Sequence, residues 1–272
     1  MSFTISGKTA IVTGAANGIG LAIARHFLDR GANVMFVDMD EDRLTDEVGS
    51  EARGDGPVRM FAGDLRQKLT ITNLLSATID AFDRVDILVN ASRMMRVSDP
   101  LKIDGDAVED MIQQNLMTGL RLSQMTAKRM IKQTEALGET GGPVPPAGSI
   151  INLSSIAATR TQSCLLGYSI ACAAVDQMTR SLAVALAPNG IRVNAVAFGS
   201  VLSGSLQAAL KDEPDWRSVI EAGTPLGRIA PAAELVETVQ YLASDASSFL
   251  TGQILSVDGG RSLLDAVAAP AH

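Results

Sequence analysis

One glycine-rich stretch constrains what this chain can fold into more than any other: Thr13-Gly14-Ala15-Ala16-Asn17-Gly18-Ile19-Gly20. It follows a short apolar run and opens a helical pattern. A buried strand, a tight glycine turn and a helix start form a phosphate-binding device, because glycine lets the backbone approach phosphates and the first helical turn has free N–H groups. We expect Gly14 to make the turn, Gly18 to admit a pyrophosphate and Gly20 to let helix and strand pack closely.

Short β-rich runs alternate with longer helical patterns along the whole chain. The strands are expected at 9–13, 33–37, 58–61, 85–89, 149–153, 192–197 and 253–257. The helices are expected at about 17–30, 40–53, 66–83, 104–136, 164–187 and 231–244. Apolar strands alternating with helices predict an α/β fold in one domain over 1–272, a doubly wound parallel sheet covered on both faces. Ligands of such sheets bind at the carboxyl ends of the strands, where the glycine turn lies.

Three segments fit neither pattern. Residues 138–148, with four glycines and three prolines, are expected to form a surface loop. Residues 199–225 are a long connection at the ligand-binding end of the sheet, and connections of this length are usually lids or binding segments. The Ala/Pro-rich tail 265–272 is expected to be frayed.

Charge and composition narrow the class of partner. The net charge of −7 and the lack of a Lys/Arg cluster argue against nucleic acid and anionic membranes. No apolar run approaches the ~20 residues of a membrane span, and no secretory signal is evident, so we expect a cytoplasmic protein. Cys164 and Cys172, eight apart in one expected helix, cannot form a bridge. His26 and His272, the two histidines, are too few for a His-based metal site or a Ser-His-Asp triad, so no metal is expected.

Asp38 ends the second expected strand, about twenty residues beyond the glycine turn. A carboxylate there can accept hydrogen bonds from the adenosine ribose and would repel a 2′-phosphate. No basic residue stands at Ala15, Ala16 or Met39 to attract that phosphate. The alternative interpretation makes Asp38 a polar strand end, but residue type, distance and strand position together favour NAD(H).

Over essentially its whole length the chain resembles the short-chain dehydrogenase/reductase family, and within it members of the 3-oxoacyl-acyl-carrier-protein reductase type. The resemblance rests on the glycine turn and on Asp64 in Ala62-Gly63-Asp64-Leu65, Asp86-Ile87-Leu88-Val89-Asn90, Asn115, Ser154-Ser155, Tyr168, Arg192-Val193-Asn194 and Val257-Asp258-Gly259-Gly260. It implies a three-layer Rossmann fold around a seven-stranded parallel sheet, and a homotetramer or homodimer.

The resemblance also implies a dinucleotide site. Its residues are Gly14, Asn17, Gly18, Ile19 and Gly20 at the phosphates, Asp38 and Met39 at the ribose, Asp64 and Leu65 at adenine, Asn90 on the adenosine side, and Tyr168 and Val201 at the nicotinamide end.

A catalytic set follows from the same resemblance. Tyr168 corresponds to the acid/base, Ser155 to the hydroxyl that hydrogen-bonds the substrate oxygen, and Asn115 to the residue that holds a relay water. Ser155 precedes Tyr168 by thirteen residues, as in the family. Alone, each could be a buried tyrosine or a capping serine, but together they favour hydride transfer between NAD(H) and a small carbonyl/alcohol substrate.

The family lysine, four residues after the tyrosine, is replaced by Cys172. That lysine holds the nicotinamide ribose and lowers the tyrosine pKa. With an unperturbed pKa near ~10, only roughly one Tyr168 in a thousand would be ionised at pH 7, so alcohol oxidation should suffer most. Two hypotheses therefore stand: an oxidoreductase of weakened or atypical activity, and a catalytically silent dinucleotide-binding or regulatory subunit. Non-redox chemistry on the same fold, such as epimerisation or dehalogenation, is a third alternative that no residue demands. Cys172 and Cys164 are interpreted as packing residues, Cys172 with an unlowered pKa.

Two further motifs depart from the family around the same pocket. Where the family has Asn-Asn-Ala-Gly, this chain has Asn90-Ala91-Ser92-Arg93, and where the family has Pro-Gly, it has Phe198-Gly199. Arg93 either supplies the charge lost with the lysine, or binds an anionic substrate, or points to solvent as most arginines do. We favour the solvent position. The substrate pocket is expected among 93–100, 156–165 and 199–225, which name no substrate.

Overall fold

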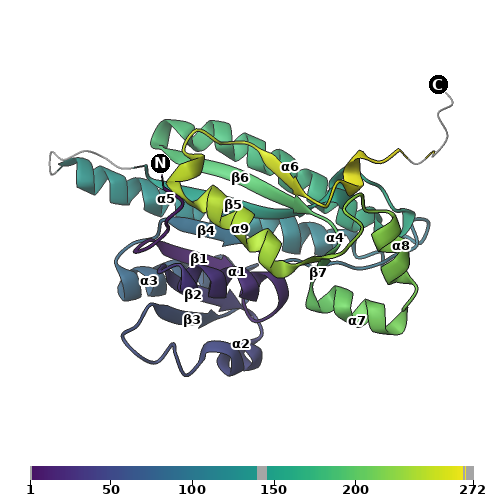
Figure 1. The fold of residues 1–272 in the computed structure, drawn as a ribbon. Coiled ribbons are helices and arrows are strands. Elements are labelled where there is room, and N and C mark those ends of the chain that lie inside the picture. Colours follow the sequence, from purple (N-terminus) through teal and green to yellow (C-terminus); the bar gives the residue numbers. More distant parts are fainter. Residues whose placement is uncertain (1, 140–145, 266, 268–272) are drawn as a thin grey trace.

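The computed structural model describes residues 2–139, 146–265 and 267. Its centre is a seven-stranded parallel sheet with the strand order β3-β2-β1-β4-β5-β6-β9 (Figure 1). The strands are β1 Thr9–Thr13, β2 Asn33–Asp38, β3 Val58–Ala62, β4 Ile87–Asn90, β5 Gly148–Ser155, β6 Ile191–Phe198 and β9 Ile254–Val257. The order reverses between β1 and β4. The predicted α/β Rossmann fold is confirmed, and its switch point lies where β1 ends.

Helices cover both faces of the sheet, because successive residues of each strand point to opposite sides. Ala10 and Val12 of β1 pack into the cluster that holds α1, α2 and α9, whereas Ile11 packs into the cluster with α3, α5 and α6. These helices are α1 Gly18–Asp29, α2 Glu41–Val48, α9 Ala232–Ala243, α3 Lys68–Phe82, α5 Thr118–Glu139 and α6 Leu166–Leu186. Figure 1 shows α1 and α9 in front of the sheet.

The fourth strand begins two residues later than predicted. Val85 is not in the ladder, because its N–H donates to the side-chain oxygen of Gln133 and its carbonyl accepts from the same amide. Asp86 instead receives the backbone N–H of Thr9 on its carboxylate. The backbone of Asp86 still pairs, because its N–H donates to the Thr9 carbonyl and its carbonyl accepts the N–H of Ser149, so side chains replace strand pairing at Val85 only.

The helix predicted over 104–136 is divided. Gly105 and Ala107 have positive φ angles of 79° and 57°, so the helix cannot begin before α4 at Val108–Met111. A π-helical turn, Ile112–Met117, then leads into α5. Such turns widen a helix by one residue and occur frequently at functional sites. This one contains Asn115.

The connection 199–225 is more regular than predicted. It holds the two-residue strand β7 Val201–Leu202, which pairs with β8 Ala230–Pro231, and the helices α7 Gly204–Asp212 and α8 Trp216–Ala222. Ser203 caps α7 by accepting a hydrogen bond from the N–H of Leu206. Neither helix buries a side chain deeply, so the sequence carries little helical periodicity there.

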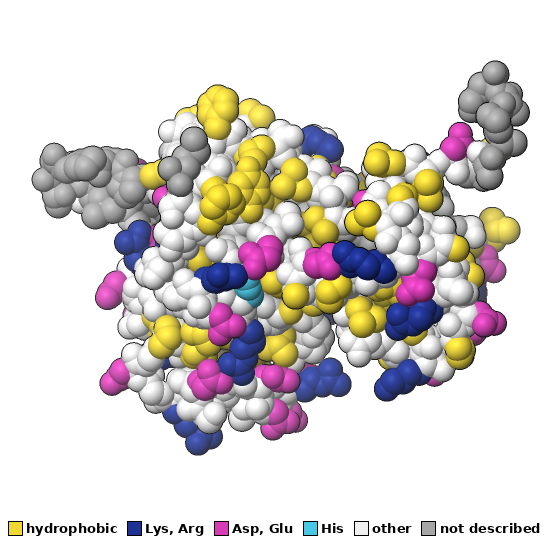
Figure 2. Space-filling view, viewed as in Figure 1, with side chains coloured by type: hydrophobic (Ala, Val, Ile, Leu, Met, Phe, Trp, Pro, Cys, Tyr) yellow, Lys and Arg dark blue, Asp and Glu magenta, His cyan; other side chains and the backbone are white. Residues whose placement is uncertain are grey.

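Two predicted segments fall largely outside the described residues: 140–145 of the loop at 138–148, and 266 and 268–272 of the tail. One described segment, Ser163–Asn189, is long and apolar enough to cross a membrane by length and composition. It contains α6, whose buried residues include Ala171, Val175 and Ala183, so it is a core helix of the fold. On the face shown in Figure 2, acidic and basic side chains are interspersed. The ion pairs of the described residues include Arg30–Glu237 and Arg228–Glu234.

Candidate active site

The glycine turn has the geometry of a phosphate cradle. Gly14 and Gly18 have positive φ angles of 69° and 55°, and a side chain on Gly18 would meet nothing within 4 Å. Space therefore opens directly beside the first turn of α1. Asn17 is the N-cap but its side chain makes no capping hydrogen bond, so the first N–H groups of α1 are not taken up by it. Ile19 is buried below the turn.

Asp38, the last residue of β2, lies next to the glycine turn. Its carboxylate accepts the N–H groups of Ala16, Met39 and Asp40 at 3.0, 2.7 and 3.2 Å. These bonds fix the carboxylate next to the glycine turn, and each oxygen keeps lone pairs for further donors. Met39 is 62% exposed at the rim.

The predicted adenine residues follow β3. Asp64 receives a two-pronged set of hydrogen bonds from Arg66, and this pairing, against the opposing effect of burial, holds the pKa of Asp64 below its usual value. Leu65 is buried at the carboxyl edge of the sheet. Val201 lies in β7, buried against the core that contains the glycine turn.

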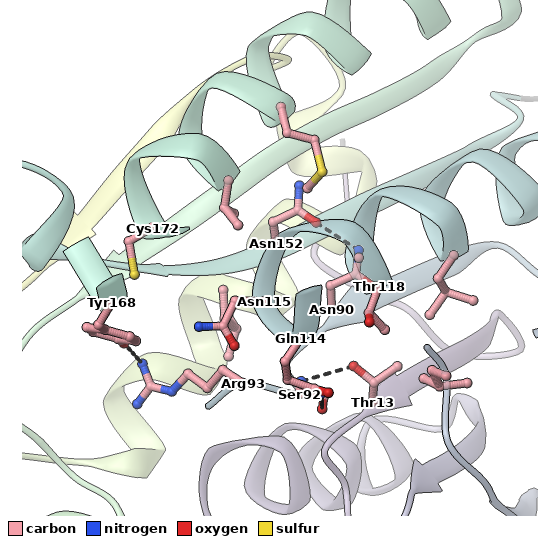
Figure 3. Close-up of a pocket in the computed structure, with 16 residues that line it drawn as sticks. Thr13, Asn90, Ser92, Arg93, Gln114, Asn115, Thr118, Asn152, Tyr168 and Cys172 are labelled. Carbon is pink, nitrogen blue, oxygen red and sulfur yellow. Dashed lines mark hydrogen bonds between the residues drawn. The ribbon is translucent and has the colours of Figure 1, made fainter. Parts of the chain in front are cut away.

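A polar network binds the ends of β1, β4 and β5 together (Figure 3). Thr13 accepts the N–H groups of Ala91 and Ser92 on its hydroxyl, both at 3.0 Å. The side chain of Asn90 donates to Asn152 at 2.8 Å and to Ser123 at 2.9 Å. The amide of Asn90 is thus already engaged within the protein. Sequence reasoning did not single out Asn152, although a buried asparagine on a strand needs partners.

Tyr168 and Cys172 lie one turn apart on α6, and Ser155 stands at the end of β5. Tyr168 as a whole residue is 3% exposed. Burial raises the pKa of Tyr168, while the positive charge of Arg93 and a hydrogen bond with Ser155 lower it; the net change is upward. The unperturbed value assumed from the sequence is therefore wrong. Burial also raises the pKa of the Cys172 thiol to about 11, so it is neutral at pH 7, as predicted.

Arg93 does not point to solvent, and that expectation is wrong. Its Nη1 donates to the phenol oxygen of Tyr168 at 2.8 Å (Figure 3). Its guanidinium carbon lies 4.3 Å from the ring centre of Phe198. The apolar ring and the phenol oxygen outcompete water, because a guanidinium is weakly hydrated and stacks well on aromatic faces.

Asn115 faces the chain segment next to Arg93. Its Oδ1 accepts the N–H of Met94 at 2.7 Å and its Nδ2 donates to the Met94 carbonyl at 2.8 Å. The structure therefore brings Asn115 to the pocket wall, with its amide used to hold the backbone. Gln114, which sequence reasoning missed, donates to the Ser92 hydroxyl at 3.0 Å on the other side of Arg93.

These side chains surround a small cavity of about 20 Å³. Its walls include Asn90, Asn115, Tyr168 and Cys172. A volume of this size holds about one water molecule.

The residues present fit an adenine dinucleotide. The open space at Gly18 faces the helix terminus, and Asp38 is fixed opposite it, which suits a pyrophosphate and a ribose. The sheet is parallel and buried, and the phosphate cradle lies at its switch point. A tyrosine and a serine come together beyond β5. These features define a nucleotide-dependent oxidoreductase of the α/β class.

Comparison with known proteins agrees with that class. The family model described as "Enoyl-(Acyl carrier protein) reductase" matches residues 14–262. The chain is 36% identical over 255 residues to the cis-4-hydroxycyclohexanecarboxylate dehydrogenase of Sinomonas cyclohexanicum, covering 93% of this chain and 96% of that one. It is 33% identical over 263 residues to the 3-oxoacyl-(acyl-carrier-protein) reductase of Salmonella typhimurium, covering 96% and 98%. The chain belongs to the short-chain dehydrogenase/reductase family, as its motifs indicated.

A solved structure of the family shows the same fold with ligands bound. It is a 7α-hydroxysteroid dehydrogenase in complex with NADH and 7-oxo glycochenodeoxycholic acid, with a TM-score of 0.84 and 28% identity. The alignment covers 95% of each chain. Members of this family bind nicotinamide dinucleotides and act on small molecules.

Proposed function

We propose that this protein is an NAD(H)-dependent oxidoreductase that interconverts a carbonyl and a secondary alcohol, with Tyr168 as the acid/base. The observation that carries the proposal is the convergence of two hydroxyls at the carboxyl edge of the sheet: Tyr168 comes from α6 and Ser155 from the end of β5, and Ser155 is among the groups that lower the pKa of Tyr168. Bound NADH would supply the hydride.

In carbonyl reduction, Tyr168 donates its proton to the substrate oxygen while Ser155 hydrogen-bonds the same oxygen. A raised pKa keeps the phenol protonated at neutral pH, which suits reduction and disfavours alcohol oxidation. The cavity beside Tyr168 has room for one water, which supports a role for Asn115 at the wall of a proton relay. Activity is expected to be weak, because Cys172 supplies no charge.

Asp38 supports NAD(H) over NADP(H), since a fixed carboxylate at the ribose repels a 2′-phosphate. The proposed cofactor site is completed by Met39, Asp64, Leu65, Asn90 and Val201.

For the assembly we propose a homotetramer or homodimer, formed through α5 and α6, and we propose that the protein is cytoplasmic. The outer face of α6 exposes Ile170 and Val184, which supports such an interface. A monomer in light scattering at micromolar concentration would contradict it.

The test compares Tyr168→Phe with Tyr241→Phe, which removes the only other tyrosine. Both variants are assayed with NADH against a panel of ketones and β-keto thioesters, and NADH binding is measured by calorimetry. We expect the wild type to turn over substrate. Tyr168→Phe should lose about 10²-fold or more of this activity while it retains NADH binding, and Tyr241→Phe should change little.

The neutral thiol at Cys172 favours a second candidate function, a catalytically silent dinucleotide-binding subunit. NADH binding without turnover on any substrate would support it.

A further inference from the structure

The phenol of Tyr168 has little support for its ionised form from its own helix. One turn along α6, Cys172 is a buried thiol that carries no charge at pH 7. From β5, Ser155 contributes a neutral hydroxyl. Transfer of the phenolic proton to a substrate leaves a phenolate, and a buried anion without a nearby cation is costly.

Arg93 is the cation that contacts this phenol. It reaches the phenol oxygen from the loop after β4, with the N–H group donating at 2.8 Å. A guanidinium stays charged at all relevant pH values. Its hydrogen bond to a phenolate is stronger than its bond to a phenol, because both charges then contribute.

The position of Arg93 is fixed from three sides. Its guanidinium stacks on Phe198 at the end of β6. Before it, the Ser92 N–H is bound by Thr13; after it, the Met94 backbone is clamped twice by Asn115. Among the side chains that the structure describes, no carboxylate forms an ion pair with Arg93, so none of them neutralises its charge.

We propose that Arg93 is the positioning residue that supplies the positive charge for proton transfer at Tyr168, from the side of the phenol opposite to α6. The proposal rests on the proposed function. In reduction, the phenolic O–H bond breaks and its proton goes to the carbonyl oxygen, while the hydride of NADH adds the electron pair to the carbon. Arg93 then stabilises the phenolate until water reprotonates it, and in oxidation it stabilises the phenolate that accepts the proton.

A spectroscopic titration tests the proposal without substrate or cofactor. The chain has two tyrosines, so Tyr241→Phe leaves Tyr168 as the only one. This protein is labelled with difluorotyrosine, whose more acidic phenol titrates while the protein is folded, and is followed by ¹⁹F NMR and circular dichroism. Replacing Arg93 by Met should raise the titration midpoint by about 1–3 pH units, and Arg93→Lys should raise it less. The matched control Arg96→Met removes a cation three residues along that pairs with Asp110, and should leave the midpoint unchanged.

An unchanged or lower midpoint in Arg93→Met would overturn the proposal. So would an equal shift in Arg96→Met. A second arm adds Cys172→Lys to Arg93→Met, and the new cation should return the midpoint toward the wild-type value; no recovery in the folded protein would count against an electrostatic role. Where turnover is measured, the pH profile of alcohol oxidation should shift in parallel. Absence of turnover in the wild type would contradict the proposed function, whereas the NMR titration would still decide the role of Arg93.

Discussion

Gly20 packs so closely on Gly14 that a side chain at position 20 is excluded. A Cβ on Gly20 would lie 2.1 Å from the carbonyl oxygen of Gly14 and 2.9 Å from that of Thr13. By contrast, a Cβ on Gly18 would meet nothing within 4 Å. The two glycines therefore serve different purposes: one closes the turn onto the strand, and the other leaves room for a ligand.

This difference predicts two distinct phenotypes. Gly20→Ala should destabilise the protein by about 1–3 kcal/mol, because the clash is with backbone that cannot move aside. Gly18→Ala meets no clash but carries the strain of a positive φ, roughly 1 kcal/mol, so its unfolding midpoint should also fall; unlike Gly20→Ala it should lose NADH affinity in the folded protein, since the methyl group enters the cradle. Urea unfolding and calorimetric NADH titration measure the two effects. Equal NADH affinity in Gly18→Ala and the wild type would remove Gly18 from the cofactor site.

Asp38 should set the cofactor preference through its charge. Ala16 donates to Oδ2 of Asp38 and Met39 donates to Oδ1, so Asp38→Asn keeps an oxygen for one of these N–H groups, turns an NH2 group toward the other, and removes the repulsion of a 2′-phosphate. We expect the ratio of NADPH to NADH dissociation constants to fall by about tenfold, equivalent to ~1.4 kcal/mol. Asp42→Ala, on the first turn of α2, is the charge-matched control and should leave the ratio as it is. If Asp38→Asn behaves like this control, the preference has another origin.

Cys172 should make the protein sensitive to alkaline pH. Its pKa is raised from 9.0 to about 11 in the folded state, so the unfolded chain loses the thiol proton first. The stability contributed by the neutral thiol is fully present below pH 9 and is lost as pH rises toward 11. Between pH 8 and pH 10 the loss amounts to about 1 kcal/mol. Urea unfolding of the wild type and Cys172→Ala at both pH values should show the stability difference between them shrinking at pH 10; a constant difference would contradict the raised pKa.

The sheet was predictable because strands and glycines obey local rules. The five residues of β1 are all buried, as an apolar run before a glycine turn requires. The interruption of the helix at 105–117 and the helices α7 and α8 could not be predicted. Positive φ angles, a π turn and short exposed helices leave no periodic pattern of apolar residues in the sequence.

The position of Arg93 in the sequence did not predict its orientation, but the other departures from the family pattern could have indicated it. Three residues that depart from the family pattern lie around the phenol of Tyr168. Arg93 donates a hydrogen bond to the phenol, and Phe198 stacks on the guanidinium of Arg93. Cys172 lies one turn from Tyr168 along α6. Sequence positions 93 and 198 are far apart, so only the sheet order, with β4 and β6 on either side of β5, brings them together.

A buried carboxylate on the same helix supplies the last prediction. Asp176 follows Cys172 by one turn and is 6% exposed, and burial raises its pKa above the ordinary value, against the smaller lowering effects of Ser154 and Arg180. Its Oδ1 has no hydrogen-bond partner among the described residues. As pH rises, the unfolded chain therefore ionises at this position before the folded protein does. The favourable contribution of the neutral carboxyl group is present below the ordinary pKa of 3.8 and is lost as pH rises through the folded value.

Above the ordinary pKa the unfolded chain therefore ionises this carboxyl group more easily than the folded protein does. Asp176→Asn should raise the urea midpoint at pH 7, because the amide is neutral in both states, and the gain should shrink as pH falls toward 4. Glu135→Gln on α5, where no such burial acts on the carboxylate, is the control and should change the midpoint little at either pH. A lower midpoint for Asp176→Asn at pH 7 would mean that the carboxylate is stabilised in the folded protein, as a partner across the α6 face of an oligomer would do. Repeating the measurement over a range of protein concentrations separates that case, because a stabilising contact between subunits weakens on dilution.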